Sequence, residues 1–301
     1  MTINSKLEGI PHIFYFNFDA RIDRKKYMED QFKKWGIDNF TRISTSKYNR
    51  KNIDDWSTNM ITGDKTETSF EPIAHSITHF DFFKEWIVSS DDPYIILMED
   101  DYDLNLIEYW HFDWNYLMSR LPYDWDCIQL GFETFDNICF YLHPIRPNYS
   151  FGPCLIKRDY IQKLLRLHCA GDIYRFDFPI SNYYWKPPLR EGYKNVSGSS
   201  DYFMCQSGNT YSIPLIALNP YFTNWNSDYC GVDWIPEIEF QICYDTFYDW
   251  WKYDRDKFTL DEFFTYGKSN DILMERRIEF CDTKYFLEKA KECRTEFLKK
   301  L

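Results

Sequence analysis

The segment that most constrains the fold is residues 93–103, PYIILMEDDYD, in which an apolar run ends in four acidic residues within five positions. A short run that is apolar at every position is typical of a strand buried on both faces of a sheet. Such a strand needs helices on both sides, so it predicts an α/β fold with this strand near the centre. The acidic residues then follow its carboxyl end, which is the edge where open α/β sheets bind ligands.

The rest of the chain continues this alternation. Gly36 follows an amphipathic segment and predicts the end of a helix there. We expect strands within residues 10–18, 40–45, 125–132, 150–158 and 210–220, the last at a sheet edge, and helices at residues 23–36, 72–89, 106–120, 159–168 and 200–206. Residues 46–70 and 172–199 read as loops, and the chain becomes helical after about residue 240. We therefore divide it into an α/β domain, 1–240, and a helical C-terminal extension, 241–301.

The charge balance and the cysteines exclude several classes of protein. The chain has 35 Lys and Arg against 47 Asp and Glu, a net charge of −12 that disfavours a nucleic acid partner. The nine cysteines form no C-x-x-C pair, which favours reduced thiols over a zinc site or a disulfide framework. There is no signal sequence and no transmembrane run, so we expect a cytoplasmic protein.

Two interpretations of the acidic cluster stay open at this point. The four side chains can form a solvated connection in which Asp103 or Asn105 caps the following helix. Alternatively, they can hold a divalent cation, because Mg²⁺ is usually bound by one or two carboxylates together with substrate phosphates.

Eight segments, in order, resemble glycosyltransferase family 25, the lipooligosaccharide and procollagen galactosyltransferases. They are FYFNFDARIDRKKYMEDQFKKWGIDNFTRIST, AHSITHFDFFKEW, PYIILMEDD, WDCIQLG, SFGPCLIKRDYIQKLL, SDYFM, YSIPLIALNP and NSD, and they span roughly residues 10–230. The chain departs from the family at Phe18 and Ala20 and in AHSITH, where the family has G-C-x-x-S-H. Nothing after about residue 240 resembles the family.

The resemblance implies a GT-A fold with a mixed Rossmann-like sheet and a metal-assisted, inverting hexosyl transfer. The implied donor is a UDP-hexose, UDP-galactose or UDP-glucose, and the cofactor is Mn²⁺ or Mg²⁺. The acceptor is a hydroxyl of a glycan, as in lipopolysaccharide biosynthesis, or of a protein. We expect Asp101 to bind the metal directly, with Asp103 and Asp228 assisting. Many GT-A enzymes add a late histidine, but none follows His168, so Asn226, Asp228 or water must replace it.

The same resemblance assigns nucleotide contacts. Glu99 and Asp100 are expected to hold the ribose or to orient metal-bound water. Asn17 is expected to contact the nucleobase, and Arg21, Arg24 and Arg42 the phosphates, although each arginine can equally be ordinary surface charge.

The resemblance also implies a general base that takes the acceptor proton. Asp201 matches the family aspartate in this role, with Glu133 in reserve. Asp201 also reads as a simple helix N-cap. His75 and His79 are four residues apart, but H-S-I-T-H lacks the glutamate of a zinc protease motif, so a structural role is favoured.

Two other functions compete with the transferase. A non-catalytic carbohydrate-binding relative would keep the fold without turnover, as the missing late histidine suggests. A glycoside hydrolase would need two carboxylates at one scissile bond and no nucleotide.

Overall fold

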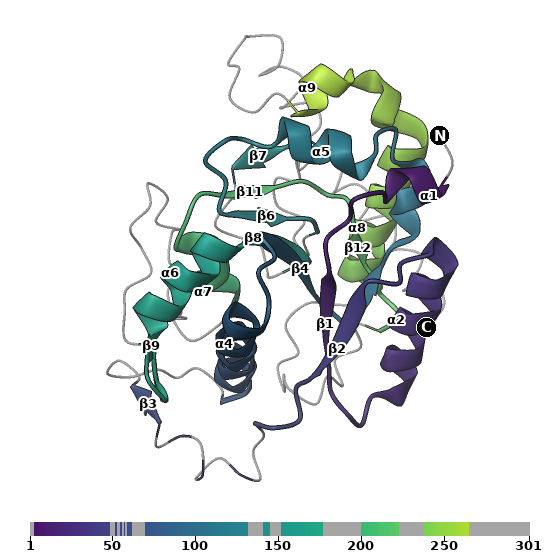
Figure 1. Cartoon of the computed structure of the whole chain (residues 1–301). Coiled ribbons are helices and arrows are strands. Elements are labelled where there is room, and N and C mark those ends of the chain that lie inside the picture. The colour runs from purple at the N-terminus through teal and green to yellow at the C-terminus, as the bar shows by residue number, and fades with distance from the viewer. Residues whose placement is uncertain are drawn as a thin grey trace, which may run out of the picture.

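The computed structural model describes residues 3–48, 52, 55, 57, 59–61, 70–131, 141–144, 152–176, 200–222 and 237–264. Within them the central feature is a mixed sheet in the order β2-β1-β4-β8-β6-β11-β7 (Figure 1). Its strands are β1 (Ile13–Asn17), β2 (Phe40–Ser44), β4 (Tyr94–Glu99), β6 (Cys127–Gln129), β7 (His143–Pro144), β8 (Cys154–Lys157) and β11 (Thr210–Ser212). The predicted α/β fold with a mixed sheet flanked by helices is confirmed.

Strand β4 occupies the interior position predicted from its apolar run. It pairs in parallel with β1 on one side and antiparallel with β8 on the other, and Ile95 to Met98 are at most 1% exposed. Strand β2 pairs in parallel with β1, β6 pairs in parallel with β11, and β7 pairs antiparallel with β11. Smaller sheets join β3 (Met60–Ile61), β10 (Ile173–Arg175) and β9 (Cys169–Ala170), and β5 (Tyr102–Asp103) with β12 (Ala217–Leu218).

Helices cover both faces of the sheet, and the alternating side chains of β4 divide between them. Ile96 and Met98 belong to one hydrophobic cluster, with α2 (Ile22–Trp35), α5 (Trp114–Arg120) and α8 (Glu237–Asp249). Ile95 and Leu97 belong to the other, with α4 (Phe70–Ser89), α6 (Arg158–His168) and α7 (Ser200–Gln206). Figure 1 shows α2 and α4 on opposite sides of β1 and β4.

Gly36 ends α2, as the sequence predicts. Its φ of 65° is left-handed, a conformation that glycine adopts without the strain of a Cβ atom. The N–H of Gly36 donates to Lys33 O at 3.2 Å, and the N–H of Ile37 donates to Phe32 O at 2.9 Å. These two bonds satisfy the last carbonyls and fix where the chain turns toward β2.

Two predicted elements are wrong. The single helix expected at 106–120 is a 3-10 helix, η2 (Asn105–Tyr109), followed by α5, because Asp113 caps a new helix by accepting the N–H of Tyr116 at 2.8 Å. The segment 210–220 is not a single edge strand, since β11 lies between β6 and β7 and ends before Pro214, and β12 follows in a separate two-stranded sheet with β5. In the expected loops 46–70 and 172–199, Met60–Ile61 form β3 and residues 173–175 form β10, and residues 177–199 lie outside the described part.

Residues 241–264, the part of the expected extension that the structure describes, are mostly helical and pack on the sheet. They contain most of α8, a π-helical turn η3 (Trp250–Asp254), a 3-10 turn η4 (Arg255–Lys257) and α9 (Leu260–Phe264). Trp251 and Phe263 belong to the same cluster as Ile96, and Trp251 Nε1 donates to Pro214 O at 2.7 Å. Of the helices described, none combines the length and apolarity required to cross a bilayer.

One carboxylate ties two segments to the second face of the sheet. Asp81 on α4 accepts hydrogen bonds from Lys47 Nζ at 2.5 Å and from the hydroxyls of Tyr48 and Tyr174. Burial alone would raise the pKa of Asp81, but the bonds from Lys47, Tyr174 and Tyr48 outweigh it and lower the pKa. Asp81 therefore links the loop after β2 and strand β10 to α4.

We expect Asp81→Asn to lower the free energy of unfolding by about 1–3 kcal/mol, because an amide accepts these three donors less strongly than a carboxylate. A lowered folded pKa means that this stabilisation is present above the unfolded pKa near 3.8 and is lost as the pH falls through the folded value. Urea denaturation at pH 7 and pH 3 measures both effects. Asp30→Asn, which removes an exposed pair with Lys26, is the control and should change little. Equal effects of the two variants would contradict the linking role.

Candidate functional site

The carboxyl ends of β1 and β4 meet at the point where the sheet changes its direction of winding. Strand β1 leads through α2 to β2 on one side, whereas β4 leads to β6 on the other. Because Phe16 is opposite Glu99, the next residues, Asn17 and Asp100, follow side by side. We call Asn17, Arg24, Asp100 and Asp101 the acidic corner. It lies where open α/β sheets bind their ligands.

Arg24 is the counter-ion of the acidic corner. Its Nη1 lies 2.9 Å from Asp100 Oδ1 and 3.3 Å from Asp101 Oδ2, and its Nη2 donates to the carbonyl of Phe222. Burial alone would lower the pKa of Arg24, but Asp101 and Asp100 raise it above its ordinary value. The arginine predicted to contact phosphate is thus already paired with the two aspartates, and this pairing makes their crowding tolerable.

Asn17 fixes the second oxygen of Asp100. Its Nδ2 donates to Asp100 Oδ2 at 2.5 Å and to Arg21 O at 3.1 Å, while its Oδ1 accepts from Arg42 Nε at 2.7 Å. Asn17 is 2% exposed. Three of the residues predicted to bind nucleotide, Asn17, Arg24 and Asp100, are therefore brought together and hold one another.

Arg21 and Arg42 lie at the rim of the acidic corner. The side chain of each is 25% exposed. Arg21 pairs with Asp23 at 2.9 Å, and Arg42 pairs with Asp19. Unlike Arg24, both guanidinium groups are within reach of solvent and of a ligand.

Asp101 has one oxygen that the described residues leave without a hydrogen bond. Its Oδ1 is buried and unpartnered among them, its Oδ2 faces Arg24, and its backbone carbonyl accepts from Asn219 N at 2.7 Å. Burial raises the pKa of Asp101 to about 6; Arg24 opposes this rise and Asp100 adds to it. Desolvation of this kind makes a carboxylate hold its proton more tightly than an exposed one does.

Asp103 is fully engaged inside the fold. Its Oδ1 accepts the N–H of Asn105 at 2.6 Å at the start of η2, and its Oδ2 accepts the Tyr244 hydroxyl at 2.7 Å. The bond to Asn105 forms a local turn just before η2, whose N-cap residue is Leu104, so Asp103 holds this connection together but is not the N-cap itself. Glu99 is the most exposed of the four acids, with 34% of its side chain accessible, and its Oε1 lies 3.6 Å from His75 Nε2.

The fit to a metal depends on Asp101. The described residues contain no group of three or more His, Cys, Asp or Glu side chains that could hold a metal ion. Asp101 Oδ1 is the carboxylate oxygen of the acidic corner that the described residues leave unpartnered, but it is buried and Arg24 faces the other oxygen of the same carboxylate. A cation that also takes water and phosphate ligands would need this oxygen to become accessible. Asp228, Asn226 and Glu133 lie outside the described residues. Asp201 is on α7, which packs against α4, and its side chain lies outside the described part.

His79 has the surroundings of a core residue, whereas His75 has 20% of its side chain exposed and lies beside Glu99. His79 is 0% exposed, its Nδ1 lies 2.9 Å from His75 O, and its ring is 4.2 Å from that of Phe16. Burial lowers the pKa of His75 to about 4 and that of His79 well below its ordinary value. These contacts support the structural role favoured from the sequence.

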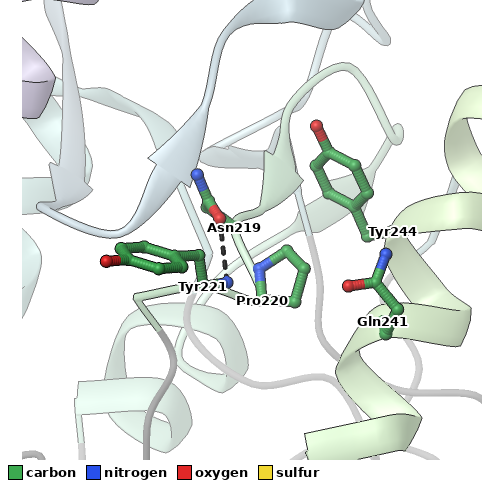
Figure 2. Close-up of a pocket in the computed structure, with 5 residues that line it drawn as sticks. All are labelled: Asn219, Pro220, Tyr221, Gln241 and Tyr244. Atoms are coloured by element: carbon green, nitrogen blue, oxygen red, sulfur yellow. Dashed lines mark hydrogen bonds between the residues drawn. The ribbon is translucent and has the colours of Figure 1, made fainter.

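A pocket of about 310 Å³ lies beside the acidic corner, and sequence reasoning missed it. It is lined by Asn219, Pro220, Tyr221, Gln241 and Tyr244 (Figure 2). The N–H of Asn219 donates to Asp101 O, and the Tyr244 hydroxyl donates to Asp103 Oδ2. Both sides of the pocket are therefore attached to the chain segment that follows β4. The available signals were the Asn-Pro turn and the helical i, i+3 spacing of Gln241 and Tyr244.

No known protein-family model matches this chain, and no curated protein gives a significant sequence match. Function must therefore be argued from the acidic corner, the pocket beside it and the order of the sequence motifs.

Proposed function

We propose that this protein is a glycosyltransferase of GT-A type, which moves a hexose from a UDP-sugar to an acceptor hydroxyl with the help of Mn²⁺ or Mg²⁺. The observation that carries the proposal is Asp101 Oδ1, a buried carboxylate oxygen without a hydrogen bond among the described residues, at the winding change of the sheet. A mixed sheet in which β8 runs antiparallel between the parallel pairs β1–β4 and β6–β11, with β7 antiparallel to β11 at the edge, is compatible with this fold.

In this proposal each residue of the acidic corner has a separate task. Asp101 would hold the cation, which when bound would supply positive charge near a departing diphosphate. Arg24 holds Asp101 Oδ2 and Asp100 in place, so it positions ligands instead of touching phosphate. Asn17 fixes Asp100, which leaves Glu99 as the more accessible carboxylate for the ribose hydroxyls.

The remaining roles follow the motif order. Arg21 and Arg42, on the accessible rim, neutralise phosphate oxygens. Asp201 takes the proton of the acceptor hydroxyl, with Glu133 in reserve, and Asp228 completes the cation site. The acceptor is a glycan or protein hydroxyl.

One observation favours a second candidate, a non-catalytic carbohydrate-binding relative. Arg24 neutralises part of the charge on Asp100 and Asp101. Both oxygens of Asp103 already accept hydrogen bonds, from Asn105 N and from the Tyr244 hydroxyl. Both features weaken this group of acids as a metal site. Such a protein would bind sugar without dependence on nucleotide and metal.

Thermal unfolding in the presence of UDP, GDP or CMP, each with and without Mn²⁺, tests the proposal. We expect UDP with Mn²⁺ to raise the melting temperature by about 4–10 °C at saturating ligand, because ligands that bind only the native state stabilise it by mass action. UDP alone and Mn²⁺ alone are the controls and should give smaller shifts. No response, or the same response to all three nucleotides, would refute a UDP-sugar donor.

A further inference from the structure

The pocket beside the acidic corner has two firmly held walls. On one side, Asn219 Nδ2 donates to the Tyr27 hydroxyl at 2.7 Å, and Asn219 Oδ1 accepts the N–H of Tyr221 at 2.9 Å. On the other side, the bond to Asp103 fixes the Tyr244 hydroxyl at 2.7 Å. In Figure 2, Pro220 lies between the Asn219 side and helix α8. A ligand would thus enter a preformed space, which reduces the entropic cost of binding.

The described lining suits hydroxyl groups. All five lining residues that the structure describes are neutral. Gln241 is exposed and uses Nε2 toward Asp245 Oδ1 at 2.9 Å; its amide has a further N–H and a carbonyl oxygen of the kind that bind sugar hydroxyls. Tyr221 is 75% exposed and offers an aromatic face at the rim.

The size and position of the pocket further restrict which kinds of ligand can bind there. A volume of about 310 Å³ is at the lower end of the ~300–1,000 Å³ range of small-molecule pockets, which suits one ring better than an oligosaccharide. The pocket is attached to Asp101 and Asp103, whereas Arg21 and Arg42, the phosphate contacts of the proposed function, lie before α2 and on β2. A sugar there would lie next to the reacting end of a donor, not in place of its nucleotide.

We propose that this pocket binds one neutral sugar unit of the acceptor, and that α8, from the extension that no family motif covers, determines acceptor specificity. The acceptor role depends on the proposed transferase function; the sugar site itself does not. Gln241 and Tyr221 are the residues that discriminate between ligands, because Asn219 and Tyr244 are held by the fold.

Saturation-transfer NMR on the full chain tests the inference, with methyl β-D-galactopyranoside and methyl β-D-glucopyranoside as probes. We expect the wild type to bind at least one of them, and Gln241→Ala and Tyr221→Ala each to weaken binding about five- to tenfold. Tyr253→Ala is the matched control, because Tyr253 is 65% exposed on the same extension and does not line the pocket. It should bind as the wild type does.

The outcomes separate this inference from the proposed function. No glycoside signal, or the same signal in Gln241→Ala and Tyr221→Ala as in the wild type, overturns the sugar pocket even if UDP with Mn²⁺ stabilises the protein. A glycoside signal lost in these variants, without any response to nucleotide, supports the sugar pocket and overturns the transferase. Both responses together, with the glycoside still bound in the presence of UDP and Mn²⁺, support an acceptor site beside a donor site.

Discussion

Replacement of Arg24 by methionine should lower the free energy of unfolding by about 3–5 kcal/mol at pH 7. The variant keeps most of the side-chain volume but leaves Asp100 and Asp101, 6% and 8% exposed, without their cation. A buried charge that loses its partner retains the full cost of its desolvation. Urea denaturation, monitored by tryptophan fluorescence, measures the change.

Arg21→Met is the matched control for this prediction. Arg21 also lies at the start of α2, but it pairs with Asp23, which is 56% exposed, so its removal should cost less than about 1 kcal/mol. Adding Asp101→Asn to Arg24→Met should recover part of the loss, because one of the uncompensated charges is removed. If Arg24→Met were no worse than Arg21→Met, Arg24 would not be the counter-ion of the corner.

The sequence predicts the framework of the site because that framework depends on local patterns. The apolar run of β4 predicts a buried central strand, and a carboxyl end in an α/β sheet predicts a ligand edge. The end of α2 at Gly36 follows from the conformational freedom of glycine. These features need no knowledge of the distant parts of the chain.

The partners of the acids depend on contacts between distant residues, so the sequence left them open. Arg24 is 76 residues from Asp100, and only the docking of α2 on the sheet decides whether it faces phosphate or an aspartate. Whether Asp103 can bind a metal depends on Tyr244, 141 residues away. The pocket was missed for the same reason, since its walls meet only when α8 packs against β12.

The two wrong elements have different causes. Position in a sheet is a long-range property, and nothing local in residues 210–220 specifies that β7 pairs outside β11. The break between η2 and α5 did have a local signal, since Asp113 is a favourable N-cap residue within an otherwise helical pattern.

Asp101→Asn should raise the stability of the protein while removing its function. Because burial raises the pKa of Asp101 to about 6 in the folded state, ionisation of this carboxyl lowers the free energy of unfolding by about 1–3 kcal/mol at pH 7. The direction of the pH dependence of stability follows from the raised pKa of Asp101 in the folded state. The unfolded chain ionises near pH 3.8 while the folded protein keeps its proton up to about pH 6, so wild-type stability falls as the pH rises between these values. The amide has no charge to bury, so the variant should lack this fall and be more stable at neutral pH.

The same substitution should remove the manganese-dependent response to UDP and lower turnover by about 10²–10³-fold, because a neutral amide oxygen is a poor substitute for an anionic ligand near a developing diphosphate. Urea denaturation from pH 4 to 8 and the nucleotide thermal shift, run on one preparation, measure both effects.

Asp103→Asn is the control: it removes a carboxylate that already accepts hydrogen bonds from Asn105 and Tyr244, so it should lower stability without a selective loss of the UDP response. A stabilised Asp101→Asn protein that still responds to UDP and Mn²⁺ would exclude Asp101 as the cation ligand. Destabilising buried charges are enriched at functional sites, so gain of stability together with loss of the response is the result that most directly identifies a functional site.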